Sequence, residues 1–317
     1  MKFFGSFIVL ALINIASVFA GPPPNVYKKD SIFEYWLSSG NAYIMDVVNT
    51  GVSNVIIPPY VTFDGIRYPV TQILGCSTNK KFQSITVNDN FDHDFSFGSF
   101  ALQNVSSLKS IIVKSNRVKA SDSAFYGLSN NLNISGAGVD KMMLSYANSW
   151  LFYNNIDPIK GYVTDSQKKN KLFEIARAVN KEFSYYSNIA NSDNGAVALA
   201  LKKGSSLGIS RAFRIIALAA GFDYNDIHVI SDNKYYSWNT INLSGRWYNL
   251  DVIKVVNTVY GDSAFNNKVL KPLYGSLTKT SNWIIYIGQY GYSGERPSGT
   301  ENFTSWLVRN RQGVRVD

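Results

Sequence analysis

Residues 82–87 read FQSITV and residues 108–113 read LKSIIV, so one strand-like segment recurs after 26 positions. A weaker copy, LNISG, follows at residues 132–136. The copies are rich in isoleucine and valine and are bounded by polar residues, a pattern typical of short β-strands. A period of 24–26 residues predicts a stack of strand–turn units, because one unit alone cannot bury its apolar edge.

The segments between these strands recur as well. Phe100 in FGSFALQNVSSL and Phe125 in SDSAFYGLSNNL are 25 residues apart, which predicts equivalent positions in successive units. Together, strands and turns resemble the BspA-type leucine-rich repeats of secreted and surface proteins over roughly residues 41–156. The resemblance implies opening strands at residues 55–73, a helical capping unit at residues 144–150, and a strand-lined binding surface whose ligand it does not identify.

The composition limits the available chemistry. The chain has 317 residues, 45% of them hydrophobic, with a formal charge of +9, one cysteine and two histidines. It is long enough for two or three domains, and its single cysteine, Cys76, excludes an intramolecular disulfide and a multi-cysteine metal site. The repeat resemblance implies that Cys76 faces inward. We expect no cofactor and no metal.

One acidic segment, NDNFDHDF, suggests a cation site. It lacks the glycine and the distal glutamate of a calcium loop, which favours a solvated insertion in the repeat over a metal site. The polar residues concerned are Asp89, Asp92, His93 and Asp94.

Residues 1–20 have the organisation of a secretory signal peptide. Lys2 precedes an apolar run at residues 7–15, and Val18 and Ala20 occupy the positions that a signal peptidase reads. A membrane anchor needs roughly 20 apolar residues, more than this run contains. The sequence therefore predicts cleavage after Ala20, which lowers the formal charge to +8, and a mature protein that is secreted or held at the cell surface without a transmembrane segment.

Four Asn-x-Ser/Thr sequons are candidate glycosylation sites if the source is a eukaryote. In a chain rich in asparagine, several such sequons also arise by chance. They begin at Asn104, Asn133, Asn242 and Asn302.

The second half of the chain predicts helices followed by strands. Apolar residues recur at helical spacing through residues 167–185, with Thr164, Asp165 or Ser166 as the N-cap. A short helix follows at residues 194–204, and a third starts at Ser205 or Ser206 and ends near residue 221. Alternating apolar residues then predict strands. Their ranges are residues 226–231, 235–243, 246–253 and, nearer the C-terminus, 283–287.

Four stretches in this half resemble the transglutaminase-like, papain-related superfamily. They read GSSLGISRAF, AAGFDYNDIHVI, YSWN and WYNLD, and the resemblance spans about residues 162–254. It implies a helix whose N-terminus packs beside an antiparallel sheet. The matching framework positions are Gly204, Gly208, Phe213, Gly221, Trp238, Asn239, Trp247, Tyr248 and Asp251.

The catalytic positions of that superfamily are altered in this chain. The resemblance puts Ser206 where the family has its cysteine, Tyr236 where it has its histidine, and Asp251 where it has its carboxylate. A serine hydroxyl has negligible anion at neutral pH, and a tyrosine with a reference pKa near 10 is a poor general base. The loss of both groups predicts a catalytically inactive domain, with Ser206, Tyr236 and Asp251 as the degenerate triad.

Residual activity through Ser206, as a hydrolase or acyltransferase, is the alternative. His228 precedes Tyr236 by eight residues across a predicted hairpin and could act as a relocated base. Lys202 and Lys203 lie just before Ser206 and could form a Ser–Lys dyad. An ordinary strand histidine and a solvated lysine pair are the favoured interpretations.

These observations predict an α+β chain in which a β-rich repeat domain precedes a helix-plus-antiparallel-sheet domain. After the signal peptide, the expected domains are residues 26–157 and 158–256, with residues 257–317 as an extension that packs on the second domain and ends in a basic tail. We expect a secreted or surface binding protein whose partner is a protein, a peptide or an anionic glycan. Export disfavours a nucleic-acid role, and the oligomeric state stays open.

Overall fold

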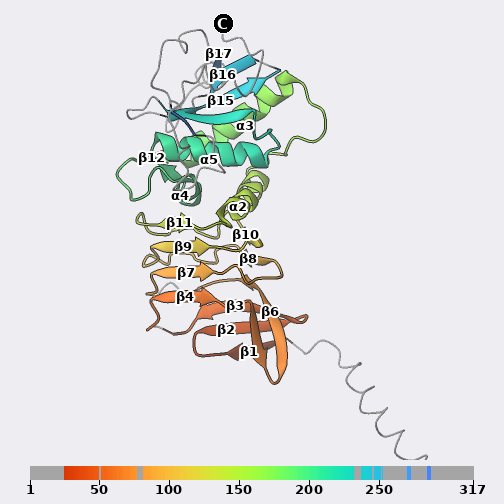
Figure 1. The fold of residues 1–317 in the computed structure, drawn as a ribbon, viewed down its shortest axis with the longest axis vertical. Coiled ribbons are helices and arrows are strands. Elements are labelled where there is room, and N and C mark those ends of the chain that lie inside the picture. Colours follow the sequence, from red (N-terminus) through yellow and green to blue (C-terminus); the bar gives the residue numbers. More distant parts are fainter. Residues whose placement is uncertain are drawn as a thin grey trace, which may run out of the picture.

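The first part of the chain is a stack of parallel strands. The computed structural model describes residues 25–49, 51–76, 81–231, 237–244, 246–250, 252, 270–272 and 284–286. A four-stranded parallel sheet of order β11-β9-β7-β4 forms one side of the stack (Figure 1). Its strands are β4 (Asn54–Ile57), β7 (Ser84–Val87), β9 (Ser110–Val113) and β11 (Asn133–Ser135).

The strand registers confirm the predicted repeat. One fully buried aliphatic residue from each strand lines up across the sheet, so each unit completes the apolar layer of its neighbour. The aligned row consists of Val55, Ile85, Ile111 and Ile134.

A second sheet forms the other side of the stack. Its order is β1-β2-β3-β6-β8-β10, and β5 pairs with β6. The first strands are antiparallel, whereas β3, β6, β8 and β10 run parallel to one another. The bounds are β1 (Val26–Lys29), β2 (Phe33–Ser38), β3 (Asn41–Val47), β5 (Tyr60–Phe63), β6 (Ile66–Ile73), β8 (Phe95–Phe97) and β10 (Val118–Ala120).

The predicted equivalence of Phe100 and Phe125 is wrong. Phe125 is fully buried, whereas Phe100 is 49% exposed. The backbone N–H of Leu102 donates to the carbonyl of Ala124, which makes buried Leu102 the counterpart of Phe125. The equivalent pairs are therefore Ala101-Leu102 and Ala124-Phe125. Phe100 projects outward from its turn.

Helix α2 (Val139–Tyr153) closes the end of the second sheet and contains the predicted capping unit. Ser145 Oγ accepts a hydrogen bond from the N–H of Ala120 (2.7 Å) and donates to its carbonyl (3.2 Å). The ring of Tyr146 stacks on Phe125 with centroids 5.6 Å apart. Helix α2 thus provides hydrogen-bond partners for the backbone of Ala120 at the edge of β10, and it covers the last apolar layer of the stack.

The second half of the chain closes the edge of β11. Asn191 Nδ2 donates to the carbonyl of Leu132 (3.0 Å), and Asn194 Nδ2 donates to the carbonyl of Ile134 (3.1 Å). Helix α4 (Gly195–Leu201) begins directly after Asn194. Two side-chain amides therefore replace the strand that would otherwise continue the ladder.

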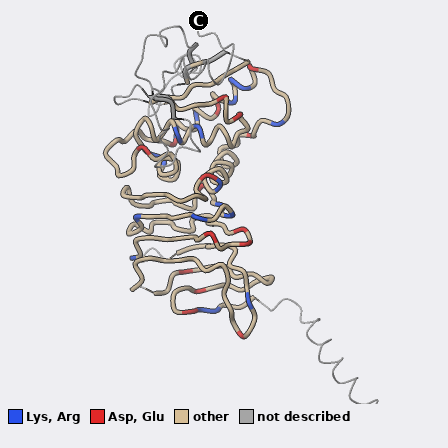
Figure 2. The backbone as a smooth tube through the Cα atoms, in the orientation of Figure 1, with Lys and Arg blue, Asp and Glu red and all other residues tan. Residues whose placement is uncertain are grey.

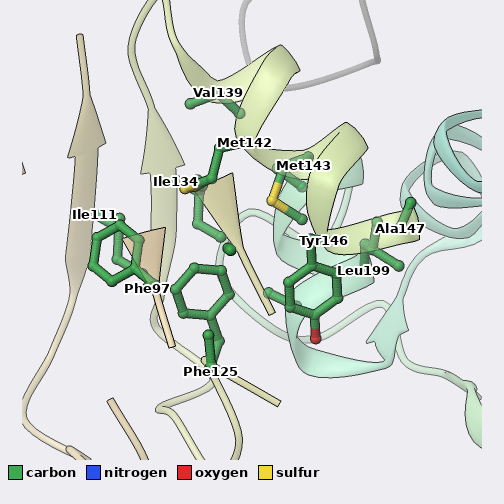
Figure 3. Close-up of a cluster of buried hydrophobic side chains, with 14 of the residues drawn as sticks. Phe97, Ile111, Phe125, Ile134, Val139, Met142, Met143, Tyr146, Ala147 and Leu199 are labelled. Carbon is green, nitrogen blue, oxygen red and sulfur yellow. The ribbon is translucent and has the colours of Figure 1, made fainter. Parts of the chain in front are cut away.

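The core runs from the stacked strands into the second half without interruption. Figure 3 shows Phe125 and Ile134 of the stack, Tyr146 of α2 and Leu199 of α4 in one cluster of buried side chains. The predicted boundary at residues 157 and 158 therefore lies between two parts of the chain that share a core.

The second half consists of helices packed on an antiparallel sheet. The helices are α3 (Asp165–Glu182), α4 and α5 (Ser206–Ala219), and the sheet order is β17-β16-β15-β14-β18. The strands are β14 (Ile227–Ser231), β15 (Ser237–Leu243), β16 (Arg246–Leu250), β17 (Leu270–Pro272) and β18 (Ile284–Tyr286). A two-stranded parallel pair, β12 (Ser184–Tyr185) and β13 (Lys203–Gly204), joins α3 to α5.

Local signals explain where these helices start. Thr164 and Gln167 form a reciprocal capping box at α3, as the predicted N-cap allows. Ser205 caps α5, which begins at one of the two predicted positions.

Lysine and arginine residues recur along α3, and Figure 2 shows them as blue segments on this helix. No helix among the described residues combines the length and the hydropathy that a membrane span requires.

The extension predicted at residues 257–317 is described only in part. β17 pairs with β16, and β18 pairs with β14, so both described segments belong to the sheet of the second half. The basic tail lies outside the described residues.

Candidate functional site

The N-terminus of α5 carries the predicted nucleophile position. Ser205 Oγ accepts a hydrogen bond from the N–H of Gly208 (3.2 Å), which caps the first turn. A Cβ atom at Gly208 would lie 2.0 Å from the carbonyl oxygen of Ser192. Glycine is required there because the first turn of α5 lies directly against the loop that precedes α4.

Ser206 is buried at the junction of α5 and β15. Its exposed fraction is 2%, and its Oγ accepts a hydrogen bond from the N–H of Ser237 (3.1 Å). This bond joins the first residue of α5 to the first residue of β15. Tyr236 and Asp251, the other two positions of the degenerate triad, lie outside the described residues.

Asn239 ties the sheet to the helix. Its Nδ2 donates to the carbonyl of Ser210 (2.9 Å) on α5 and to the carbonyl of His228 (3.3 Å) on β14. The residue is completely buried and pairs with Leu250 across β16. Its amide fixes the position of β15 relative to the first turns of α5.

The structure does not bring His228 to Ser206. Val229 packs with Leu207 of α5 and is paired with Asn239, whose side chain bonds α5. Side chains alternate between the two faces of a sheet, so the neighbouring His228 points to the face opposite α5. This geometry argues against a Ser206–His228 dyad.

Neither lysine forms a dyad with Ser206. Lys203 Nζ donates to Asn130 Oδ1 (3.3 Å) in a turn of the stacked strands. Lys202 Nζ lies over three aromatic rings, at 5.0 Å from the centroid of Tyr146, 5.3 Å from Trp150 and 5.4 Å from Phe183.

The environment of Lys202 is an aromatic cage at the junction of the two halves. Its Nζ is buried and has no hydrogen-bond acceptor among the residues that the structure describes. Burial lowers its pKa from the ordinary 10.5 to about 8, against the attraction of Glu182 and Asp122. Glu182 is held beside the cage because Trp150 Nε1 donates to its carboxylate (2.7 Å).

A second buried charge lies between α2 and α5. Arg214 is 2% exposed, and its Nε donates to the carbonyl of Ile227 (2.9 Å). Burial raises the pKa of Asp140, in the first turn of α2, to about 7, and the charge of Arg214 opposes this rise. Sequence reasoning missed Asp140 and Arg214, although charged residues on apolar helix faces are a signal that could have found them. It named Lys202, but the favoured interpretation of a solvated lysine is wrong, because Lys202 Nζ is buried.

The acidic segment makes internal contacts. Tyr60 OH donates to the carboxylate of Asp92 (2.7 Å), and His93 bonds Asp92 through Nδ1 (2.8 Å) and the carbonyl of Val70 through Nε2 (3.0 Å). Asp94 pairs with a lysine of β10. Among the described residues, no group of three metal-ligating side chains is assembled.

The sequons differ in accessibility. Asn104 is exposed, Asn133 belongs to β11, and Asn302 lies outside the described residues. Asn242 is 7% exposed and its Nδ2 donates to Asp226 Oδ1 (3.1 Å), so a glycan there would require the amide to leave this contact.

No family model matches the chain, and no curated protein matches it significantly. Its front half is a leucine-rich-repeat-like β-solenoid. Partial likenesses to solved structures accompany this fold, and the chain spans between 31% and 39% of the length of each.

The first of these structures is a leucine rich cell surface protein from Faecalibacterium prausnitzii A2-165, 22% identical over 36% of this chain with a TM-score of 0.30. The second is a leucine-rich repeat protein from Bacteroides ovatus, 15% identical over 37% of this chain with a TM-score of 0.22. The third is the pneumococcal vaccine antigen PcpA, 10% identical over 38% with a TM-score of 0.23. The parallel pairing of successive strands in both sheets defines the solenoid.

Proposed function

We propose that the chain is an exported binding protein in which a leucine-rich-repeat solenoid precedes a catalytically inactive transglutaminase-like domain. The observation that supports catalytic inactivity is the burial of Ser206. Its hydroxyl is buried and accepts a hydrogen bond from the N–H of Ser237, so Ser206 contributes to the packing of α5 on β15.

The chemistry of the position supports the same conclusion. A helix N-terminus stabilises a thiolate, which is the reactive form of cysteine. It cannot make an alkoxide from serine at neutral pH, and a serine nucleophile needs a positioned base. His228 and Lys202 face elsewhere, and Tyr236 stands where the superfamily has its histidine.

The binding role is supported by the solenoid and by the predicted export signal. The four-stranded sheet has two outward rows and neither carries a charge: one alternates isoleucine with threonine or serine, and the other, the polar row, carries only amide and hydroxyl side chains. An ordered polar surface of this kind suits recognition, because a rigid scaffold holds its donors and acceptors in place. The polar row consists of Asn54, Ser84, Ser110 and Asn133.

We expect residues 21–317 to incorporate no more dansylcadaverine into casein than the variant Ser206→Ala. A fluorophosphonate probe should label neither protein at residue 206, because the hydroxyl is buried and the register of β14 turns His228 away from α5. The double variant Ser206→Cys, Tyr236→His tests the domain assignment, since it restores the thiol and the imidazole, and we expect measurable amine incorporation from it. Labelling of the wild-type chain at Ser206 would instead establish the hydrolase or acyltransferase alternative.

The binding half of the proposal has its own test. Fluorescently labelled chain, added to intact cells of the organism that produces it, should bind their surface in flow cytometry and be displaced by excess unlabelled chain. Equal signal with and without competitor would contradict a specific surface-binding role.

A further inference from the structure

Two aromatic rings lie exposed side by side on adjacent turns of the solenoid. Phe100 is 49% exposed and Tyr126 is 61% exposed. Their ring centroids are 6.4 Å apart and their planes are nearly perpendicular. Most aromatic residues of the solenoid are buried, so packing of the core does not account for this pair.

The backbone of Phe100 is strained. Its φ is 59°, in the left-handed region, where a bulky side chain is an outlier. Among the described residues, eight other than glycine have positive φ, and Phe100 is the only aromatic one. Glycine or asparagine would fit this turn better, and an exposed ring returns little packing energy. Strain that the fold does not need is characteristic of functional positions.

Polar side chains lie on the same two turns as the rings. Ser99 Oγ lies 3.3 Å from Ser121 Oγ, which lies 3.3 Å from Ser123 Oγ. The amide of Asn104, also at positive φ, stands against Gly127 next to Tyr126. The site therefore combines two apolar faces with hydroxyl and amide groups that can both donate and accept hydrogen bonds.

The charge around the rings is low. In residues 98–107 and 121–130, the two turn segments that carry the rings, Asp122 is the only charged side chain. The two segments contribute one carboxylate, and the lysine that contacts them, Lys203, bonds Asn130 at the end of the second segment. This balance gives the rings no excess of positive charge for an anionic ligand, in contrast to the +8 balance of the whole mature chain.

We propose that Phe100 and Tyr126 form a platform that binds a neutral glycan. Sugar rings present a C–H face that packs on aromatic rings and a rim of hydroxyl groups that exchange hydrogen bonds with serine, asparagine and carboxylate side chains. Two rings on successive coils suit a chain of linked sugars better than a single one. This proposal rests on the proposed surface-binding function and specifies its ligand class.

The test measures binding of residues 21–317 to cellohexaose, laminarihexaose and chitohexaose by isothermal titration calorimetry, with heparin as the anionic comparison. The protein is made in a bacterial host, so that the sequon at Asn104 carries no sugar of its own. We expect at least one neutral hexamer to bind, and Tyr126→Ala to weaken it by about tenfold or more. Phe100→Gly should weaken it similarly while its Tm is unchanged or higher, because glycine relieves the strain at positive φ.

Tyr27→Ala is the matched control, because Tyr27 is a 65% exposed aromatic on β1, at the opposite edge of the second sheet from β10. It should keep wild-type affinity. Wild-type affinity in Phe100→Gly and Tyr126→Ala would overturn the proposal, as would binding of heparin alone. If the chain binds intact cells but none of the neutral hexamers, the platform is wrong and the surface-binding function stands; if it binds neither, both are wrong.

Discussion

Replacing Asn194 by leucine is expected to lower the free energy of unfolding by about 4 kcal/mol, the sum of a lost helix cap and a lost strand-edge contact. Asn194 Oδ1 accepts hydrogen bonds from the N–H groups of Ala196 (2.9 Å) and Val197 (3.3 Å) at the start of α4. Its Nδ2 donates to the carbonyl of Ile134 at the edge of β11. Leucine has a similar size but leaves all three buried backbone groups without this partner.

Two further variants separate these contributions. Asn194→Asp keeps the cap but sets a carboxylate oxygen against the carbonyl of Ile134, so it should lose about half as much stability as leucine. Asn191→Ala removes the part-buried hydrogen bond to the carbonyl of Leu132 and places alanine at a φ of 57°, so it should cost about 2 kcal/mol. Urea unfolding of the three variants, followed by far-UV circular dichroism, gives the values. Equal costs for Asn194→Leu and Asn191→Ala would show that Asn194 does not join the two halves.

Asn194 also shows what sequence could predict and what it could not. Its position before the apolar run GAVALAL is a helix-start signal, and the predicted helix began there. The hydrogen bond from its Nδ2 to the carbonyl of Ile134 joins residues 60 positions apart, and no local sequence pattern predicts such a contact. The same holds for the solenoid: the strands were predicted because the period repeats, whereas the closing of its last edge depends on a loop outside the repeat.

In the candidate site, too, the sequence predicted some features, whereas others became known only from the structure. The helix was predicted to start at Ser205 or Ser206, and the resemblance of GSSLGISRAF to the superfamily put Ser206 at the nucleophile position. The close approach of Gly208 to Ser192 gives the physical reason for the matching glycine. The face on which His228 lies followed only from the register of β14 with β15. Phe100 was misassigned because a repeated phenylalanine suggests a core position, and the sequence does not reveal that its φ is positive.

Raising the pH from 8 to 9.5 is expected to stabilise the protein by about 1.5 kcal/mol through Lys202, because the slope rises from about half of 1.36 kcal/mol per pH unit at the folded pKa to the full value above it. Below pH 8, both the folded and the unfolded chain carry the Lys202 proton, and this residue adds no slope. Between the folded pKa of about 8 and the unfolded value of 10.5, only the unfolded chain keeps the proton. Stability therefore rises with pH over this window, because the folded state no longer holds a buried ammonium.

The variant Lys202→Met tests the assignment, since methionine keeps an unbranched side chain inside the ring cage without a charge. Between pH 8 and 9.5, its free energy of unfolding should lack the rise that Lys202 causes in the wild type. At pH 7, its free energy of unfolding should exceed that of the wild type by about 1–2 kcal/mol. The gain is smaller than the full desolvation cost because cation–π contact with three rings, each worth about 0.5–1 kcal/mol, already offsets part of it. Lys203→Met is the control, because its ammonium lies outside the cage and bonds Asn130. Urea titrations at pH 7, 8 and 9.5 decide the matter: an unchanged slope in Lys202→Met, or a loss of stability at pH 7, would mean that the rings hold the ammonium more strongly than burial opposes it.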